Sequence, residues 1–466
     1  MIQADIQWLA TTLDVNAEKC ADSKQSITTI STDSRTIEPD QAFLALKGPN
    51  FDGHRFIEDV KQKGATCVIV DHLVDVDIPQ LVVKDTLRAL GRLGAEVKRT
   101  VNPKTLAITG SVGKTSVKEM CAAILAQKGE VLATGGNFNN EIGVPLTLLR
   151  LEPKHEYAVI ELGANHIGEI AYTTSLTQPN VAILNNVAEA HLEGFGSLDG
   201  VVTAKGEIFQ GLKQGGVAVV NADSPYKQIW LDELEQKFSN QSGSTVQFSL
   251  QQGPQQTPVF YADNIELNAL GCAEFDLKFE QQTVKIELVV PGKHNVANAL
   301  AAATACYNLG ASFEDIQNGL KTMQKVKGRV NLNQVSERLS VIDDTYNANV
   351  RSVKAAIDLV TGFEGKSMLV LGDMGELGHE ARRLHQEVGE YGLEQGLDYL
   401  ISFGVLSQSA SKVFENNGEH FSTKQSLIES VNKLIQQNSE KMTILVKGSR
   451  SAKMELVVQQ LIEDNQ

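Results

Sequence analysis

Cysteine is scarce in this sequence. The chain of 466 residues holds five cysteines, which lie far apart and never in a C-x-x-C spacing. An odd number of dispersed cysteines argues against a disulfide framework, and the lack of paired spacing argues against a structural zinc site. The pattern therefore favours a protein of a reducing cytoplasm.

Basic residues are also in short supply. The chain has 42 Lys and Arg against 57 Asp and Glu, which gives a formal net charge of −15. Binding to nucleic acid without regard to sequence needs clustered Lys and Arg, so we expect no nucleic-acid partner. An anionic ligand must then be held by a few well-placed groups.

Long apolar runs are missing as well. No uninterrupted stretch reaches the roughly 20 residues that a membrane-spanning helix needs. The N-terminal stretch MIQADIQWLATTLDV carries Asp5 and lacks the basic-then-apolar order of a secretory signal. We expect a soluble, unprocessed protein without a membrane span.

Length and patterning predict an α/β protein of three domains. At about 150 residues per domain the chain suggests roughly three, and a hydrophobic content of 42% is enough for each to have a core. Residues 1–84 mix short apolar runs with the turn-rich KGPNFDGH, which indicates a small α/β module. Residues 85–327 and 328–466 alternate strand-like runs with helical patterns, which predicts mostly parallel sheets, the second of Rossmann-like character. Within the middle segment, residues 243–291 are rich in alternating β-formers, and we expect an inserted antiparallel portion there.

One stretch, LAITGSVGKTSVKEM at residues 106–120, has the order strand, glycine loop, helix. In that order the backbone N–H groups of the loop and the helix dipole attract phosphate, Lys114 reaches the β- and γ-phosphates, and Thr115 or Ser116 offers an oxygen to Mg²⁺. The strict G-x-x-x-x-G-K-[ST] pattern is not met, because Ile108 stands where its first glycine would be. The alternative is a strand-to-helix turn with an incidental lysine, but the context on both sides favours a phosphate loop, whose residues are Gly110, Ser111, Val112, Gly113, Lys114, Thr115 and Ser116.

Three further side chains follow strands of the same predicted sheet. Glu161 stands at the carboxyl end of the run YAVIEL, where open α/β sheets place their ligands, and is a candidate Mg²⁺ ligand. His191 lies in a turn-rich loop and Lys205 near a predicted helix start. A lone His is more often structural and a lone Lys more often solvated. Because both follow a strand of one sheet, the functional interpretation is favoured.

Seven stretches are informative through their order and spacing: TGSVGKTS, GGNFNNEIGVPLTLL, ELGANHIGEI, NVAEAHLEGFGS, AKGEIF, PGKHNVANALAA and DDTYNANVRS. Together they resemble the Mur ligase family, the ATP-dependent amide ligases of peptidoglycan precursor synthesis in bacteria. The resemblance covers nearly the whole chain. It is greatest to the member that adds D-alanyl-D-alanine to a UDP-N-acetylmuramoyl tripeptide, with GDMGELG and VKGSRSAKME also similar to that member.

The resemblance implies a UDP-sugar-substrate-binding domain at 1–84, a central ATP-binding domain at 85–327, and a C-terminal domain at 328–466 that brings D-alanyl-D-alanine. We expect a cytoplasmic monomer that uses ATP and two Mg²⁺ sites, one on Thr115 and Glu161 and a second near His191. Lys205 resembles the lysine that family members carry as a carbamate, which assists magnesium binding.

The remaining residues that the resemblance assigns contact the nucleotide or the two peptide substrates. For the nucleotide they are Asn295 and Asn298 at adenine, Arg329 reaching back from the C-terminal domain, Asp344 at the ribose, and Tyr346 beside it. For the substrates they are Asn139 and Asn140 at the muramyl group, Ser34, Arg35, Gly48 and His54 at uridine diphosphate, Asn347 close to Asp344, and Lys447, Ser449 and Arg450 at the dipeptide carboxylate. Around Ser34 and His54 a plain turn-rich surface loop is the competing interpretation. The sequence departs from the family at Val350, where the dipeptide-adding member usually has proline.

Two other classes of function compete with the dipeptide-adding ligase. A sibling ligase, such as the enzyme that adds the third peptide residue or a folylpolyglutamate synthetase, is disfavoured because no DNPR stretch occurs. A nucleotide-switch binding protein is disfavoured because no N-K-x-D motif occurs and two further domains suit an enzyme with two substrates. Neither alternative accounts for DDTYNAN together with GDMGELG.

Overall fold

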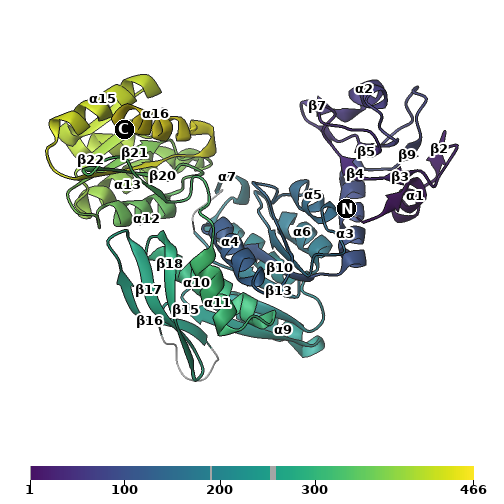
Figure 1. Cartoon of the computed structure of the whole chain (residues 1–466), viewed down its shortest axis with the longest axis horizontal. Coiled ribbons are helices and arrows are strands. Elements are labelled where there is room, and N and C mark those ends of the chain that lie inside the picture. The colour runs from purple at the N-terminus through teal and green to yellow at the C-terminus, as the bar shows by residue number, and fades with distance from the viewer. Residues whose placement is uncertain (1, 189–191, 252–258) are drawn as a thin grey trace.

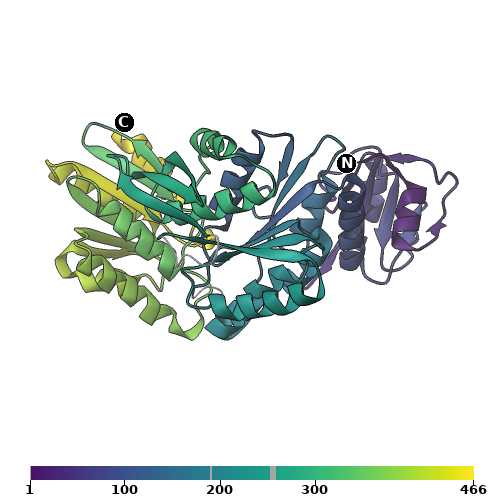
Figure 2. The same cartoon turned by 90° about the horizontal axis from the view of Figure 1, so that it is seen from below.

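The computed structural model describes residues 2–188, 192–251 and 259–466. Three parts follow one another along the molecule, with the purple N-terminal sheet and the yellow-green C-terminal sheet at opposite ends (Figures 1 and 2). Each part is built on its own sheet, and the large sheets are mostly parallel. The predicted α/β class with three domains is confirmed.

The N-terminal part rests on a five-stranded sheet of order β2-β9-β8-β5-β4. Its inner strands coincide with the runs QAFLAL and ATCVIV, because a strand covered on both faces is apolar throughout. The elements are β1 (Ala4–Asp5), α1 (Ile6–Leu13), β2 (Ala17–Glu18), β3 (Ser26–Ile27), β4 (Thr29–Ser31), β5 (Gln41–Leu44), β6 (Lys47–Gly48), β7 (Phe51–Asp52), η1 (Gly53–Phe56), α2 (Ile57–Gln62), β8 (Cys67–Val70) and β9 (Gln80–Val82).

Helix α3 (Thr86–Val101) joins this sheet to the central part. The Asp85 side chain caps its N-terminus by accepting a hydrogen bond from the Arg88 N–H at 3.0 Å. Arg92 fastens it to the end of α1 by donating to the carbonyls of Thr12 and Leu13 at 2.7 and 3.0 Å. The helix therefore contacts the N-terminal part along one side and central helices along the other (Figure 1).

The central part contains a nine-stranded sheet of order β11-β12-β10-β13-β14-β15-β16-β17-β18. Its strands are β10 (Lys104–Thr109), β11 (Val131–Ala133), β12 (Tyr157–Glu161), β13 (Val181–Leu184), β14 (Gly216–Asn221), β15 (Gly243–Ser249), β16 (Val259–Leu267), β17 (Cys272–Phe279) and β18 (Gln282–Pro291). The antiparallel portion expected at 243–291 is smaller than predicted and is not a separate insertion. Strands β15 and β16 continue the parallel sheet, and the pairing becomes antiparallel only from β16 to β18.

Helices cover both faces of the central sheet. Since successive side chains of a strand point to opposite faces, Ala107 of β10 packs in one core while Leu106 and Ile108 pack in the other. The Ala107 core holds residues of α3, α5 (Gly143–Leu149), α6 (Glu169–Thr177), α7 (Leu192–Phe195), α8 (Leu198–Gly206), η2 (Glu207–Phe209) and α9 (Lys227–Asn240). The opposite core holds residues of α4 (Lys114–Leu125), α10 (His294–Asn308) and α11 (Phe313–Thr322).

The C-terminal part has a six-stranded sheet of order β19-β20-β24-β21-β22-β23, in which β19 is antiparallel and the others are parallel. Two helical layers again cover it, each with its own apolar cluster. The elements are β19 (Asn331–Gln334), β20 (Leu339–Asp344), α12 (Val350–Val360), β21 (Lys366–Gly372), η3 (Gly378–Glu380), α13 (Ala381–Glu394), β22 (Tyr399–Phe403), α14 (Gln408–Ser411), η4 (Lys412–Asn417), β23 (Gly418–Phe421), α15 (Lys424–Gln437), β24 (Met442–Lys447), η5 (Arg450–Ala452) and α16 (Glu455–Asn465). Within the described ranges, every helix is too short or too polar to cross a bilayer.

Candidate nucleotide-binding site

The loop between β10 and α4 has the geometry that the sequence predicts. Gly113 precedes the first turn of α4 with φ of +78°, a backbone conformation that residues with a Cβ rarely adopt. A Cβ at this position would also lie 2.5 Å from Asn298 Oδ1. The glycine is therefore required both by the turn and by the close approach of α10, and the N–H groups that begin α4 have no intrahelical acceptor.

The loop is fastened by the segment that follows β13. The Val112 N–H donates to Asn186 Oδ1 at 3.0 Å, and Asn186 Nδ2 donates back to the Val112 carbonyl at 2.9 Å. The Ser111 hydroxyl donates to the Ala188 carbonyl at 3.1 Å and accepts from the Ala188 N–H at 3.0 Å. These bonds fix the loop before any ligand arrives. Asn186 was not among the predicted site residues, although the pair NN directly after a predicted strand is a signal of this kind.

Glu161 ends β12 beside the loop, as predicted. Its side chain is buried and accepts hydrogen bonds from Thr115 Oγ1 at 3.0 Å and from Asn139 Nδ2 at 2.8 Å. Its N–H donates to Thr134 Oγ1 at 3.0 Å. A carboxylate and a hydroxyl thus meet at the carboxyl end of parallel strands, and these are oxygen ligands of the type that Mg²⁺ prefers.

Lys114 lies against its own loop. Its Nζ donates to the Gly110 carbonyl at 2.8 Å. Burial lowers the pKa of Lys114 below its ordinary value, and the nearby Arg329 guanidinium lowers it further, while Glu161 acts in the opposite direction. An anionic ligand at the loop would offset both effects by stabilising the cation.

Lys205 lies in the last turn of α8, not near a helix start as predicted. It is 1% exposed, and its Nζ has no hydrogen-bond partner among the described residues, although the Phe195 ring centroid is 5.3 Å away. Burial lowers the pKa of Lys205 to about 7, with Lys114 acting in the same direction and Glu169, Glu207 and Glu161 opposing it. Burying an amine without a hydrogen-bond acceptor costs free energy, and buried polar groups in proteins normally have a partner. The position of Lys205 therefore needs a functional or structural reason.

The predicted pair on α10 is confirmed to lie on one face. Asn298 Nδ2 donates to Asn295 Oδ1 at 2.9 Å, and Asn298 Oδ1 accepts from Asn185 Nδ2 at 3.0 Å. The same Asn185 amide donates to the Val112 carbonyl at 3.1 Å. The two asparagines are therefore connected to the phosphate loop, and Asn185 is a further cavity residue that the sequence reasoning did not single out.

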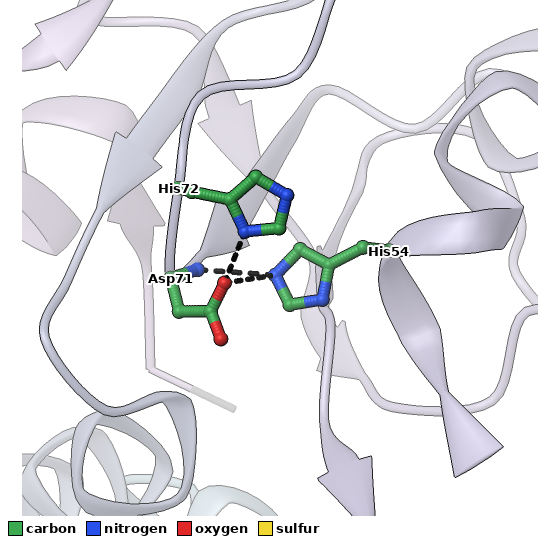
Figure 3. A group of neighbouring side chains, drawn as sticks. All are labelled: His54, Asp71 and His72. Carbon is green, nitrogen blue, oxygen red and sulfur yellow. Dashed lines mark hydrogen bonds and ion pairs between the residues drawn. The ribbon is translucent and has the colours of Figure 1, made fainter.

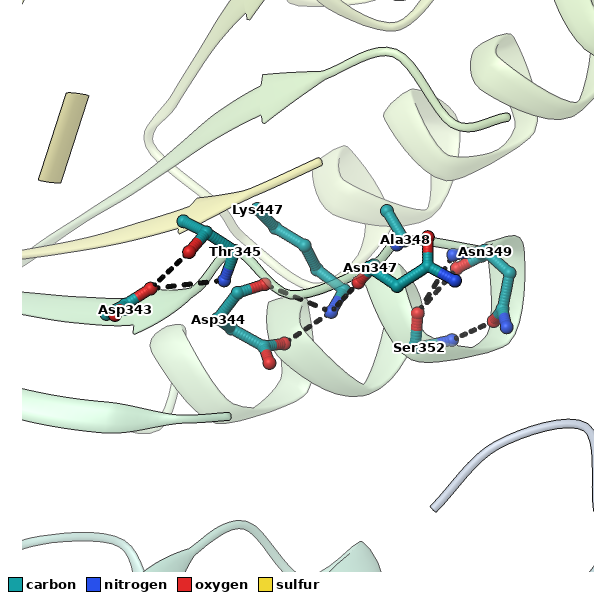
Figure 4. Close-up of polar contacts among 8 residues, drawn as sticks. All are labelled: Asp343, Asp344, Thr345, Asn347, Ala348, Asn349, Ser352 and Lys447. Carbon is teal, nitrogen blue, oxygen red and sulfur yellow. Dashed lines mark hydrogen bonds and ion pairs between the residues drawn. The ribbon is translucent and has the colours of Figure 1, made fainter. Parts of the chain in front are cut away.

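Residues from the C-terminal part face this region. The Arg329 guanidinium stacks 4.1 Å from the centre of the Tyr346 ring. Asp344 ends β20 and forms an ion pair with Lys447 at the end of β24, with 2.5 Å between Asp344 Oδ2 and Lys447 Nζ. Figure 4 shows the lysine reaching from its strand to both Asp344 and the Asn347 carbonyl. The sequence predicts separate contacts for Asp344 and Lys447, whereas the structure pairs them with each other.

One cavity of about 780 Å³ joins these groups between the central and C-terminal parts. The predicted residues that line it are Ser111, Val112, Gly113, Lys114, Thr115, Ser116, Asn139, Asn140, Glu161, Asn295, Asn298, Arg329, Asp344, Tyr346, Asn347, Lys447 and Arg450. The predicted residues Gly110, Lys205 and Ser449 are not among those that line it. His191 lies outside the described residues.

Two basic residues of the cavity were missed by sequence reasoning. His294 is the first residue of α10 and lines the cavity. Arg351 lies in the first turn of α12 and donates to the Val187 carbonyl at 3.3 Å, which links the C-terminal part to the segment after β13. The signal for Arg351 was its place in the stretch DDTYNANVRS, seven positions after the predicted ribose carboxylate Asp344.

The other C-terminal predictions are placed at the edge of the cavity. Ser449 is buried, and its N–H donates to the Asp373 carbonyl at 3.0 Å. Arg450 is mostly exposed and pairs with Glu455 at 2.9 Å. Val350, which stands where the family usually has proline, is the first residue of α12, and Asn349 caps that helix. Proline suits the first helical position, so valine here changes no polar contact.

The predicted N-terminal residues lie apart from this cavity. Arg35 pairs with Asp33 at 2.7 Å on the surface, and the Ser34 carbonyl accepts from Lys63. Gly48 is exposed in the short strand β6. His54 is almost fully buried, with Nδ1 2.7 Å from Asp52 Oδ1 and Nε2 accepting from the Asp71 N–H at 3.1 Å, and the His72 ring stacks on it (Figure 3). The structure therefore brings the nucleotide candidates together and leaves the uridine-diphosphate candidates at the other end of the molecule (Figure 1).

A phosphate loop at the carboxyl edge of a parallel sheet, a buried Glu beside it and a second α/β part facing it define a nucleotide-binding α/β protein of multidomain type. Three family descriptions match along the chain: Mur ligase family, catalytic domain, at residues 26–129; Mur ligase middle domain at 108–306; and Mur ligase, glutamate ligase domain, at 328–450. The chain belongs to the Mur ligase family.

Curated relatives agree with this assignment. The chain is 47% identical over 435 residues to UDP-N-acetylmuramoyl-tripeptide–D-alanyl-D-alanine ligase of Escherichia coli, covering 93% of this chain and 94% of the relative. It is 35% identical to the protein of the same name from Bacillus subtilis, covering 93% of each.

Solved structures agree as well. The crystal structure of MurF from Acinetobacter baumannii superposes with a TM-score of 0.92 at 37% identity, covering 99% of each chain. MurF ligase from Thermotoga maritima in complex with ADP superposes with a TM-score of 0.81 at 26% identity, covering 94% of this chain and 97% of that one.

Proposed function

We propose that this chain is an ATP-dependent ligase that adds D-alanyl-D-alanine to a UDP-N-acetylmuramoyl tripeptide in peptidoglycan precursor synthesis. The observation that carries the proposal is one cavity in which the phosphate loop, Glu161 and the Asp344–Lys447 pair meet across two parts of the chain. The curated relatives with this activity in their names match over more than nine-tenths of the chain. Residues 1–84, 85–327 and 328–466 would bind the UDP-linked substrate, ATP and the dipeptide, respectively.

ATP would lie along the cavity from the phosphate loop toward the C-terminal part. The N–H groups that begin α4 and the Lys114 ammonium would hold the β- and γ-phosphates. Asn295 and Asn298, which are buried in the α10 wall, would contact adenine, and Asp344 the ribose. Arg329 would meet the nucleotide from the C-terminal side. The complex of the Thermotoga maritima relative with ADP supports nucleotide binding in this fold.

Magnesium fits the donor set at the loop. Thr115 Oγ1 and the Glu161 carboxylate, which are 3.0 Å apart, would hold one ion, and His191 would stand near a second. The bound ions would neutralise charge on the phosphates and on the transferring phosphoryl group. Asn139 holds the other oxygen of Glu161 and so keeps the carboxylate turned toward Thr115.

Lys205 fits the carbamate that the family resemblance implies. Its Nζ is buried without an acceptor among the described residues, and its pKa of about 7 leaves much of the amine neutral at physiological pH. A neutral amine attacks carbon dioxide, forms an N–C bond and releases one proton. The resulting anion would assist magnesium binding and accept hydrogen bonds that an ammonium group cannot accept.

The reaction has two steps. The terminal carboxylate of the tripeptide attacks the γ-phosphorus of ATP, which gives an acyl phosphate and ADP. The amine of D-alanyl-D-alanine then attacks the acyl carbon, and phosphate leaves from the tetrahedral intermediate as the amine loses its proton. Lys114 and the N-terminus of α4 stabilise the charge that builds in the first step. Asn139 and Asn140 would contact the muramyl group, and Ser449 and Arg450 the dipeptide carboxylate.

Phosphate release separates this function from its competitors. With ATP and UDP-N-acetylmuramoyl tripeptide, we expect sustained release only when D-alanyl-D-alanine is added, together with the mass of the ligated product. Release with a single amino acid instead of the dipeptide would indicate a sibling ligase. Release without any acceptor would indicate a nucleotide switch. Parallel reactions with tripeptides that carry diaminopimelate or lysine identify the preferred third residue.

A further inference from the structure

Lys447 makes further contacts besides its ion pair with Asp344. It ends β24 in parallel register with Asp344 at the end of β20, so the two side chains leave adjacent strands at the same level. Their side chains are 2% and 9% exposed. The Lys447 Nζ lies 2.5 Å from Asp344 Oδ2, 3.0 Å from the Asn347 carbonyl and 3.5 Å from the Asp344 carbonyl (Figure 4).

These three contacts provide an acceptor for each N–H donor of the Lys447 ammonium group. An ammonium group has three N–H donors and no acceptor, and each contact is to an oxygen within the protein. No donor is left for the carboxylate of a dipeptide, which is the role that the sequence resemblance implies for Lys447. Arg450, which is mostly exposed at the edge of the cavity, pairs with Glu455 through one guanidinium nitrogen.

We propose that Lys447 is a positioning residue for nucleotide binding: it holds the Asp344 carboxylate by one oxygen, so that the other oxygen faces the cavity and accepts a hydrogen bond from a ribose hydroxyl. This inference rests on the proposed function. Asp344 lines the cavity, and within the described ranges its Oδ1 takes no hydrogen bond from the protein. In Figure 4 that oxygen points away from the lysine.

Hydrogen bonds hold the loop after β20 at several points, and Lys447 supplies one of them in the middle of the loop. Asp343 Oδ1 accepts from the Thr345 hydroxyl at 2.6 Å, and Asn349 exchanges hydrogen bonds with Ser352 at the start of α12. Between them, the Lys447 contact to the Asn347 carbonyl holds the part of the loop that borders the cavity. Without the lysine, Asp344 would be a buried carboxylate that has lost its cation, a state that is unfavourable in proteins, and it would turn toward water or take up a proton.

The test measures how well the protein distinguishes ribose from deoxyribose. Isothermal titration calorimetry with ADP, 2′-deoxyADP and 3′-deoxyADP gives three dissociation constants without any peptide substrate. We expect the wild-type chain to bind ADP about tenfold or more tightly than at least one deoxy analogue, because a hydrogen bond to a charged group carries at least that much discrimination. In Lys447→Met, the ratio of the dissociation constant of that deoxy analogue to the dissociation constant of ADP should fall toward one. Loss of packing alone would weaken all three ligands equally and leave the ratio unchanged.

Two variants complete the experiment. Lys366→Met is the matched control: Lys366 begins β21 in the same sheet and pairs with Asp398 at 2.9 Å, at the end of the sheet away from the cavity, so its ratio stays that of the wild type. Lys447→Gln keeps an amide group in the buried position but lacks the charge and the full reach of the lysine, and it serves as the test if Lys447→Met does not fold. Its ratio also falls toward one.

The possible outcomes separate this inference from the function on which it rests. Wild-type discrimination that survives in Lys447→Met or Lys447→Gln overturns the inference. So does a variant whose Michaelis constant for the dipeptide rises while its nucleotide affinities stay unchanged, since Lys447 would then bind the dipeptide. Failure of the wild-type chain to bind ADP at all would overturn the proposed function itself.

Discussion

At the level of single residues, the charge of Lys114 is the simplest feature to test. Its Nζ lies against the Gly110 carbonyl, where the phosphates would replace that contact. We expect Lys114→Ala to lower the rate of ATP-dependent ligation by about a hundredfold or more, since a buried cation at a transferring phosphoryl group contributes that much. Phosphate release and product mass measure it.

A lysine just beyond the same helix provides the control for Lys114. Lys128 follows α4 and lies 3.6 Å from Asp315 on the outside of the central part. Lys128→Ala should keep turnover within about twofold of the wild type, because exposed ion pairs contribute little to stability. Near-normal turnover in Lys114→Ala would contradict the phosphate-loop assignment.

Lys205 offers a chemical rescue experiment. We expect Lys205→Ala to lose most activity, because the carbamate that it would carry cannot form, and to regain part of it when formate or acetate is added. The measurement is the initial rate against carboxylate concentration. Lys237→Ala is the control, since this lysine donates to the Gln210 carbonyl at 3.0 Å and is not a cavity residue. A Lys205→Ala variant as active as the wild type would remove the carbamate idea.

The pKa of Lys205 also predicts a dependence of stability on pH. It is about 7 in the folded chain against an ordinary 10.5, so between these values the unfolded chain binds a proton that the folded chain does not. The free energy of unfolding should therefore rise with pH from about 7 to 10.5, by up to about 1.4 kcal/mol per unit, in buffers free of carbon dioxide. Denaturation of the wild type and Lys205→Met at several pH values measures the difference. Parallel curves for the two proteins would show that Lys205 is not the source.

Many of the residues that line the cavity could be predicted from the sequence. The features that could not be predicted have a physical reason in common. The glycine loop, Glu161 and the α10 asparagines carry local signals, because their geometry depends on one strand or one helix. The pairing of Asp344 with Lys447 joins positions 103 residues apart in sequence, and it follows only from the adjacency of β20 and β24. For the same reason the burial of Lys205 could not be read from its neighbours in the chain.

At the level of elements, the strands were predicted well where they are buried on both faces. Among the strand-like runs of residues 85–327 and 328–466, GVAVVN forms β14 and LSVIDD forms β20, since a parallel strand between two helical layers is largely apolar. The stretch 243–291 was predicted less well. Alternation identified strands there, but β15 pairs in parallel with both β14 and β16, and nothing in the local pattern of β15 specifies its partners.

The N-terminus of α12 gives a prediction at this scale. Asn349 caps the helix by accepting from the Ser352 N–H at 2.9 Å, and the helix borders the cavity. Asn349→Ala should lower the free energy of unfolding by about 0.5–2 kcal/mol and weaken nucleotide binding, because the loop carrying Asp344 ends at this cap. Thermal unfolding and ADP titration measure the two effects.

An equivalent cap elsewhere provides the control. Ser312 caps α11, which is not a wall of the cavity, by accepting from the Asp315 N–H at 3.1 Å. Ser312→Ala should lose a similar amount of stability while the affinity for ADP stays unchanged. Equal losses of affinity in both variants would mean that the α12 cap has no special relation to the cavity.

At the level of the whole molecule, the three parts of the chain do not share their apolar cores equally. Residues of the N-terminal sheet and of one face of the central sheet belong to a single core, whereas the C-terminal part has two clusters of its own. The C-terminal part meets the central one across the cavity, with the Arg351 contact to Val187 as one direct hydrogen bond. We infer that the C-terminal part moves as a unit.

That inference leads to a prediction about shape. Closure of the C-terminal part over ADP and the UDP-linked substrate should lower the radius of gyration in small-angle X-ray scattering, because the N-terminal and C-terminal sheets lie at opposite ends of the molecule (Figure 1). ADP alone is the comparison for the two ligands together. An unchanged scattering curve with both ligands bound would indicate that the substrate spans the molecule without any movement.

The shared helix α3 has a consequence for anyone who exchanges modules between family members. Leu90, Leu93 and Val97 pack in the core common to the first two sheets, and Gly94 approaches α5 so closely that an added Cβ would lie 2.9 Å from the Pro145 carbonyl oxygen. A chimera whose junction lies just before α3 would place the N-terminal sheet of another protein against apolar side chains of α3 that pack on a different sheet. A transplant that includes α3 must also bring an α5 that fits it, so the N-terminal sheet cannot be exchanged independently of the central part.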